Sequence, residues 1–184
     1  MRARQPLPRT WLMTDERQGD LLWAALRNVP RGSGVIFRHY SLAPATRWAM
    51  FERVRRVARR RGLLLLLAGP PSLARAWHAD GSHGRGPRHS RFGLRSTPVH
   101  SLPEIRAAER AGADLLLLSP AFATASHPGR APLGPLRFGM LAGGARLPVI
   151  ALGGMTGQRA RRLRPFGIWG WAAIDAWTNQ PAAR

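Results

Sequence analysis

The stretch Leu147-Pro-Val-Ile-Ala-Leu-Gly-Gly-Met155 predicts a buried strand that leads through a glycine turn into a helix. Four apolar residues, Val149 to Leu152, follow one another without a polar break, as in a parallel strand that is buried on both faces. Gly153 and Gly154 come next, where the missing side chains let the backbone bend or approach another group closely. Thr156 then begins a predicted helix. Glycine amides at the start of a helix can hold a phosphate, but these residues taken alone favour a tight turn without a ligand.

The composition is that of one globular domain with a sizeable core. The chain has 184 residues, 45% of them hydrophobic, which excludes disorder of the whole chain. It contains no cysteine, so disulfides and thiolate metal sites are excluded. Its longest apolar run, Leu63 to Ala68, is too short to span a membrane, and residues 1–9 lack the apolar segment of a secretory signal. A cytoplasmic location without a membrane partner is expected.

The net charge of +20 is the strongest feature of the composition. A charge of this size suggests nucleic acid, anionic lipid or a phosphorylated substrate as a partner. All 29 basic residues are arginine, however, and they are scattered over the chain, as a bias in codon composition would produce. An arginine-rich nucleic-acid binder therefore remains an alternative, but it is not favoured, because no nucleic-acid-binding motif accompanies the charge.

Short apolar runs alternate with helical patterns along the chain. Strands are expected at about residues 11–15, 34–40, 63–67, 81–83, 91–97, 113–119, 148–152 and 170–175. Helices are expected between them at 19–28, 45–61, 73–78, 101–111, 134–143 and 156–163. Ser72 is expected to cap the third helix, and Ser101 with Glu104 to form a capping box at the fourth.

This alternation predicts an α/β fold, a compact (β/α)8 TIM barrel with a shortened fourth βα unit and a truncated last helix. An open doubly wound sheet is the alternative. The barrel is assigned to residues 11–177, between a basic tail of residues 1–10 and a C-terminal tail of residues 178–184. In both folds the active site lies at the carboxyl ends of the strands, so polar residues after each apolar run are the candidates for function.

Four segments in the second half of the chain resemble one known family in their order and spacing. They are His100-Ser-Leu-Pro-Glu-Ile-Arg-Ala-Ala-Glu-Arg-Ala-Gly-Ala-Asp114, Ser119-Pro-Ala-Phe-Ala-Thr-Ala-Ser-His-Pro128, Pro132-Leu-Gly134 and Pro148-Val-Ile-Ala-Leu-Gly-Gly-Met155. The sequence is similar to the thiamine phosphate synthase and TenI (thiazole tautomerase) family. The resemblance is clear over residues 95–176 and looser in the first half.

The resemblance implies a phosphate-binding TIM barrel of thiamine biosynthesis. The synthase joins a pyrimidine pyrophosphate to a thiazole phosphate, and magnesium with basic residues neutralises the departing pyrophosphate. The tautomerase moves a proton to aromatise the thiazole phosphate, which requires an acid–base group and no metal.

The resemblance also implies which residues form the site. His100 matches the acid–base histidine of the tautomerase, a position where synthases often carry a histidine too. The substrate- and phosphate-binding positions of the family match Arg38, Thr124, Ser126, His127, Gly153 and Gly154. His127 stands in place of a lysine, and Asp175 stands where the family has a serine. Ordinary roles compete with these assignments: His100 could cap a helix, Arg38 could be a solvated arginine, and Thr124 and Ser126 could be plain loop hydroxyls.

The metal ligands that the resemblance implies are missing from the sequence. The acidic residues expected after the third and fourth strands fall near Ala68-Gly69 and Pro87-Arg88. Asp15 and Asp80 are the acidic residues expected closest to that rim, and Asp80 could compensate only in a different register. No metal ligand and no cofactor are therefore expected, with Mg²⁺ entering only if the chain is a synthase.

A second place for a metal is the segment that holds His78, Asp80, His83 and His89. Histidine and carboxylate side chains can bind zinc, but the spacing matches no standard motif, so a solvated loop is favoured.

The sequence thus predicts a divergent, metal-poor TenI-like member that acts on or binds thiazole phosphate, with proton transfer through His100. The alternatives are a true Mg-dependent thiamine phosphate synthase and a non-catalytic binder of a phosphate ligand. The expected partner is a small phosphorylated substrate, and the sequence does not determine the oligomeric state.

Overall fold

A computed structural model describes residues 6–86, 92–124 and 131–178. Its strands are all parallel, and each pairs with the next until the last pairs with the first, which closes a barrel. The strands are β1 (Thr10–Met13), β2 (Gly34–Phe37), β3 (Leu64–Ala68), β4 (Gly81–His83), β5 (Leu94–Val99), β6 (Leu115–Leu118), β7 (Val149–Ala151) and β8 (Gly170–Ala173). The predicted TIM barrel is confirmed, and the open doubly wound sheet is excluded.

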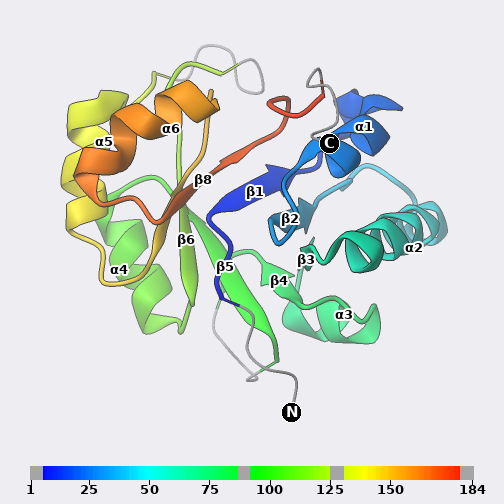
Figure 1. Ribbon diagram of the computed structural model, residues 1–184. Helices are drawn as coiled ribbons and strands as arrows, with labels where there is room; N and C mark the ends of the chain where they lie inside the picture. The colour runs from blue at the N-terminus through cyan, green and yellow to red at the C-terminus, as the bar shows by residue number, and fades with distance from the viewer. Residues whose placement is uncertain (1–5, 87–91, 125–130, 179–184) are drawn as a thin grey trace.

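The helices surround the strands, as Figure 1 shows, with α1 to α3 on one side of the barrel and α4 to α6 on the other. They are α1 (Leu21–Asn28), α2 (Pro44–Arg61), α3 (Pro71–Ala76), α4 (Leu102–Arg110), α5 (Gly134–Gly143) and α6 (Gly157–Leu163), with short 3₁₀ turns at Glu16–Gln18 and Arg164–Phe166. None of the helices in the described part of the chain is long and apolar enough to cross a membrane.

The two irregularities predicted for the barrel are present in the described residues. Strand β4 has three residues, and no helix lies between it and β5 within residues 84–86 and 92–93. After β8, the described chain continues to Thr178 without a further helix. The stacked rings of Trp171 and Trp177, 4.9 Å apart, pack there against the outer core instead.

Alternation along the strands divides the core into two parts. One set of side chains fills the barrel: Trp11, Met13, Ile36, Leu66, Ala68, Leu115, Leu117, Ile150, Ala172 and Ile174. The opposite set, with Phe37 and Leu67 among its largest members, packs under the helices in one cluster with helix residues such as Phe51 and Phe138. Because apolar side chains fill the interior between the strands, the space left for a ligand lies above them, at the carboxyl ends.

Two predicted helix starts need correction. Helix α3 begins at Pro71 after Pro70, and no side chain caps it, so the predicted Ser72 cap is wrong. At α4 the hydroxyl of Ser101 does accept from the backbone N–H of Glu104. The carboxylate of Glu104, however, accepts from the N–H of His100 at 2.9 Å, so it completes the cap one residue earlier than a capping box would.

Most predicted strands run one to three residues too far at their carboxyl ends. Residues 14–15, 38–40 and 174–175 lie outside β1, β2 and β8 and form part of the rim. Thr14 explains one of these differences, because its side chain contacts the ring of His39 and accepts from the N–H of Arg38 instead of continuing the strand.

Candidate functional site

A cavity of about 470 Å³ opens at the carboxyl ends of the barrel strands. Its walls come from seven strands and the loops that follow them, and they include Met13, Arg38, Tyr40, His83, Pro98, His100, Ser119, Thr124, Leu152, Gly153, Gly154, Met155, Thr156, Arg159, Ile174 and Asp175. This is the end of the barrel where active sites of this fold lie.

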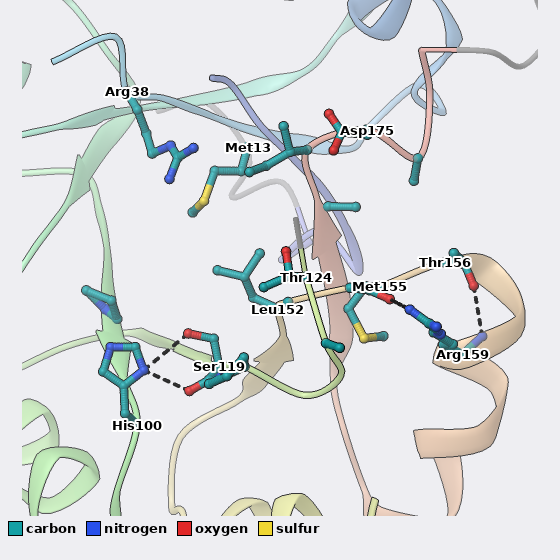
Figure 2. Close-up of a pocket in the computed structure, with 18 of the residues that line it drawn as sticks. Met13, Arg38, His100, Ser119, Thr124, Leu152, Met155, Thr156, Arg159 and Asp175 are labelled. Atoms are coloured by element: carbon teal, nitrogen blue, oxygen red, sulfur yellow. Dashed lines mark hydrogen bonds between the residues drawn. The ribbon is translucent and has the colours of Figure 1, made fainter. Parts of the chain in front are cut away.

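Five of the seven predicted site residues therefore meet at one cavity, although they lie far apart in the sequence. They are Arg38, His100, Thr124, Gly153 and Gly154. The other two, Ser126 and His127, lie outside the described residues. In Figure 2, His100 and Arg159 stand on opposite sides of the cavity, with Thr124, Leu152 and Met155 between them.

The position of His100 follows from the alternation of β5. Leu94 packs with the interior cluster, and Pro98 and His100, at even intervals after it, line the cavity. The Nδ1 atom of His100 lies 2.7 Å from the carbonyl oxygen of Ser119 and 3.2 Å from its hydroxyl (Figure 2). Because a carbonyl oxygen only accepts, Nδ1 must carry the proton, and Nε2 of the neutral ring is left with a lone pair. The ring is thus oriented as a base.

Arg38 is held in place by the end of β1. Its Nε donates to the carbonyl of Thr14 at 2.8 Å, and its Nη2 pairs with the carboxylate of Asp15. Partial burial raises the pKa of Asp15, but hydrogen bonds from Arg17 and the charge of Arg38 outweigh it and hold that pKa below its usual value. Asp15 is therefore ionised at neutral pH, and it offsets much of the charge that Arg38 brings to the cavity.

Arg47, on α2, fixes the backbone behind Arg38. Its guanidinium donates to the carbonyl of Arg38 at 2.8 Å and to that of Ala68, after β3, at 2.7 Å. It also lies 5.6 Å from the centre of the Tyr40 ring. The ends of β2 and β3 are thereby tied together at the rim.

The glycine turn, Gly153 and Gly154, follows β7 as predicted. Both residues have positive φ angles, 96° and 59°. A Cβ on Gly153 would lie 2.8 Å from the Cα of Pro120, and a Cβ on Gly154 would lie 2.2 Å from the carbonyl oxygen of Ala123. Close packing against the loop after β6 therefore requires glycine at both positions.

The same turn lines the cavity and carries polar backbone groups. The N–H groups of Gly153 and Gly154 have no hydrogen-bond partner within the described part of the chain. The guanidinium of Arg159 donates to the carbonyl of Gly154 and lies 5.0 Å from the centre of the Phe122 ring. The hydroxyl of Thr156 caps α6 by accepting from the N–H of Arg159. Free amides beside a fixed cation are a suitable environment for an anion.

Arg159 and His83 line the cavity although no site prediction names them. Arg159 is one of the 29 scattered arginines, and His83 lies in the segment for which the sequence favours a solvated loop. The signal for His83 was available, since it ends the short predicted strand at 81–83, where polar residues were expected to matter. For Arg159 the sequence offers no signal, because no local pattern distinguishes it from the other arginines among the 29 in the chain.

The described rim does not fit a magnesium site. Asp15 is engaged by Arg38 and Arg17. Asp80 precedes β4 and so lies at the opposite end of the barrel, where its carboxylate accepts from the N–H of Leu65 at 2.8 Å. The idea that Asp80 compensates for a missing ligand is therefore wrong. Pro87 and Arg88 lie outside the described residues.

The alternative metal cluster is not assembled either. His83 lines the cavity, whereas His78 and Asp80 precede β4 at the other end of the barrel, and His89 lies outside the described residues. Within residues 6–86, 92–124 and 131–178, no three acidic, histidine or cysteine side chains come together as a metal site would require. Asp175 is exposed at the mouth of the cavity, on the loop after β8 (Figure 2).

The fold and the site define a (β/α)8 barrel with a cavity at the carboxyl ends of its strands. The sequence model of a family described as thiamine monophosphate synthase matches residues 96–177. An Aquifex aeolicus (strain VF5) protein named "Putative thiamine-phosphate synthase 2" is 30% identical over 182 residues, which cover 92% of this chain and 97% of that protein. The thiamine-phosphate synthase of Chlorobium luteolum (strain DSM 273 / BCRC 81028 / 2530) is 34% identical over 131 residues, 66% of this chain and 62% of that protein.

Among solved structures, a thiamine phosphate pyrophosphorylase from Pyrococcus furiosus has the same fold. Its TM-score is 0.79 at 22% identity, with 95% of this chain and 89% of that chain covered. The chain belongs to the thiamine phosphate synthase/TenI family.

Proposed function

We propose that this chain binds a thiazole phosphate in the barrel cavity and catalyses its tautomerisation by proton transfer through His100. The observation that carries the proposal is the hydrogen bond from Nδ1 of His100 to the carbonyl of Ser119. It leaves Nε2 of a cavity-lining ring as the proton acceptor. Once protonated, the same nitrogen can return the proton to another carbon of the substrate, so one group serves as both base and acid.

The phosphate of the substrate is assigned to the glycine turn. The amides of Gly153 and Gly154 can donate to phosphate oxygens, and Arg159 adds a positive charge beside them. Arg38 is the less suitable partner, because Asp15 already neutralises it. With the phosphate at the turn and His100 across the cavity, the ring of the substrate would lie between them, against Leu152 and Met155.

A magnesium-dependent thiamine phosphate synthase is the second candidate. The names of the curated relatives favour it, since the Aquifex and Chlorobium proteins are both named as synthases. The chemistry of the described rim favours the tautomerase, because hard oxygen ligands for Mg²⁺ are not assembled there. A non-catalytic binder of thiazole phosphate is the third candidate.

Turnover assays separate the three candidates. We expect the purified chain to aromatise the thiazole phosphate tautomer without added metal, and His100→Ala to lower the rate by at least about 100-fold with little change in substrate affinity. His78→Ala is the matched control, since this exposed histidine lies at the other end of the barrel.

Three other outcomes would contradict the proposal. Equal rates for His100→Ala and the parent chain would remove His100 from the mechanism. Condensation of the pyrimidine pyrophosphate with thiazole phosphate that rises with added Mg²⁺ would establish the synthase. Binding of thiazole phosphate without either reaction would leave the non-catalytic candidate.

A further inference from the structure

We propose that His83 recognises the heteroaromatic ring of the ligand through its Nε2 atom at the inner end of the cavity. The inference rests on the proposed function, which identifies the ring as a thiazole. It adds that His83 forms a hydrogen bond with a nitrogen of that ring. Nothing in the proton-transfer step through His100 requires His83.

The first observation is that His83 is almost fully buried and yet lines the cavity. Its exposed fraction is 5%, and it is the last residue of β4, so it lies between the strands and not on a rim loop. Its Cα pairs with those of Ala68 and Ser96 across the sheet, and Ala68 packs with the interior cluster. His83 therefore points into the barrel.

The second observation concerns the hydrogen bonds of the ring. Nδ1 of His83 lies 2.8 Å from the hydroxyl of Ser96, which is itself fully buried. Nε2 has no hydrogen-bond partner in the described part of the chain, and it does not belong to the buried polar atoms left without one. The free nitrogen is therefore open to the cavity, where a ligand can reach it.

The Ser96 hydroxyl permits two tautomers of His83. A hydroxyl can donate to Nδ1 or accept from it, whereas the carbonyl that holds His100 can only accept. When the hydroxyl donates, Nε2 carries the proton and can donate to a ring nitrogen of the ligand. Burial, with a smaller effect of the charge on Arg38, lowers the pKa of His83 to about 4, so the ring stays neutral in either tautomer.

The surroundings suit a flat ring. Met13, Pro98 and Leu152 supply apolar surface to the same cavity. A mostly apolar cavity with one directed polar group is the usual form of a site for a heteroaromatic ligand. The ligand class is thus a five- or six-membered heterocycle with a nitrogen in the ring.

Two substitutions at His83 separate its two nitrogens. The amide of asparagine reaches the position of Nδ1 and keeps the contact to Ser96, but it leaves nothing at Nε2. The amide of glutamine reaches the position of Nε2. We expect His83→Asn to weaken the binding of thiazole phosphate and of the unphosphorylated thiazole alcohol by about tenfold, the loss of one hydrogen bond. We expect His83→Gln to restore most of this loss.

Calorimetric titration of the full chain with both thiazoles and with inorganic phosphate tests the proposal. Affinity for inorganic phosphate should be the same in both variants and the parent. If the parent binds and turns over thiazole phosphate but His83→Asn binds both thiazoles as tightly as the parent, the inference is overturned and the proposed function stands. If the parent binds neither thiazole, the proposed function and this inference both fall.

A measurement on the parent chain avoids any effect of the substitutions on folding. The ¹⁵N resonance of His83 Nε2 should shift when thiazole alcohol is added and should not shift with inorganic phosphate. If the thiazole alcohol binds but the chemical shift of His83 Nε2 does not change, the inference is also overturned.

Discussion

The polar groups on the two sides of the cavity differ in whether they already have a partner in the protein. On the first wall, defined by Arg38 and His83 from the ends of β2 and β4, the charge of Arg38 is offset by its partner Asp15, and the ring of His83 is kept neutral. On the second wall, defined by His100 and the glycine turn from β5 to β8, two amides stay without a partner in the described chain.

This contrast between the two walls indicates where an anion is expected to bind. A charged group that already has a partner gains little from a ligand, whereas an amide without one gains a full hydrogen bond. We therefore expect the second wall to hold the phosphate and the first to orient the uncharged part of the ligand. The match of the family model to residues 96–177 covers the second wall and leaves the first outside.

The largest expected effect is a dependence of stability on pH, which tests whether His83 on the first wall stays uncharged. His83 has a pKa of about 4 in the folded chain and an ordinary value of 6.5, so as the pH falls the unfolded chain takes up the proton first. The contribution of His83 to the free energy of unfolding should be at its maximum above pH ~6.5. It should decrease by up to about 3 kcal/mol as the pH drops to about 4. Urea unfolding across this range measures it.

His83→Gln is the control for this experiment, because it removes the titrating group. His39, whose pKa is also lowered, mainly by burial, stays in both chains and contributes in the same direction. Identical pH dependence of the two chains would show that the first wall does not exclude a proton at His83.

The next effect tests the shape of the second wall. Gly154→Ala would place a Cβ 2.2 Å from the carbonyl oxygen of Ala123 at a φ of 59°. We expect the free energy of unfolding to fall by about 2 kcal/mol and the affinity for thiazole phosphate to fall with it. Gly157→Ala is the matched control, since a Cβ there would meet no atom within 4 Å. Equal stability of the two variants would mean that the turn tolerates a side chain and is not closely shaped.

The smallest effect tests the charge of the second wall. Arg159→Ala should weaken the binding of thiazole phosphate by about tenfold, and the difference should shrink at high salt. Arg162→Ala, on the exposed face of the same helix, removes an equal charge away from the cavity. If both variants lose affinity equally, the net charge of the chain attracts the phosphate and the placement of Arg159 is irrelevant.

The fold was predictable from the sequence because each element carries its own local signal. Continuous apolar runs located the strands, and α5 and β4 have the predicted bounds, Gly134–Gly143 and Gly81–His83. The strand ends were harder, because residues such as Thr14 are compatible with a strand, and only contacts across the rim turn them into loop. The cap predicted at Ser72 was wrong because α3 already begins at Pro71, after Pro70, so Ser72 lies inside the helix.

The residues that line the cavity were predictable only where their position after a strand or the resemblance pointed to them. His100, Arg38 and the glycine turn were found in this way. Asp80 was considered for the rim although the strand predicted at 81–83 begins directly after it, which places Asp80 at the amino-terminal end of β4, away from the cavity. The partners of Arg38 and Arg159 depend on segments from elsewhere in the fold, and no local pattern encodes them.

The bond from Arg159 to the carbonyl of Gly154 has an inductive consequence. The carbonyl belongs to the same peptide group as the N–H of Met155, and a cation on its oxygen draws electron density away from that nitrogen. The N–H becomes more acidic and a better donor, although it carries no formal charge. Arg159 can thus strengthen a hydrogen bond from the N–H of Met155 to an oxyanion in the cavity without contacting the oxyanion itself.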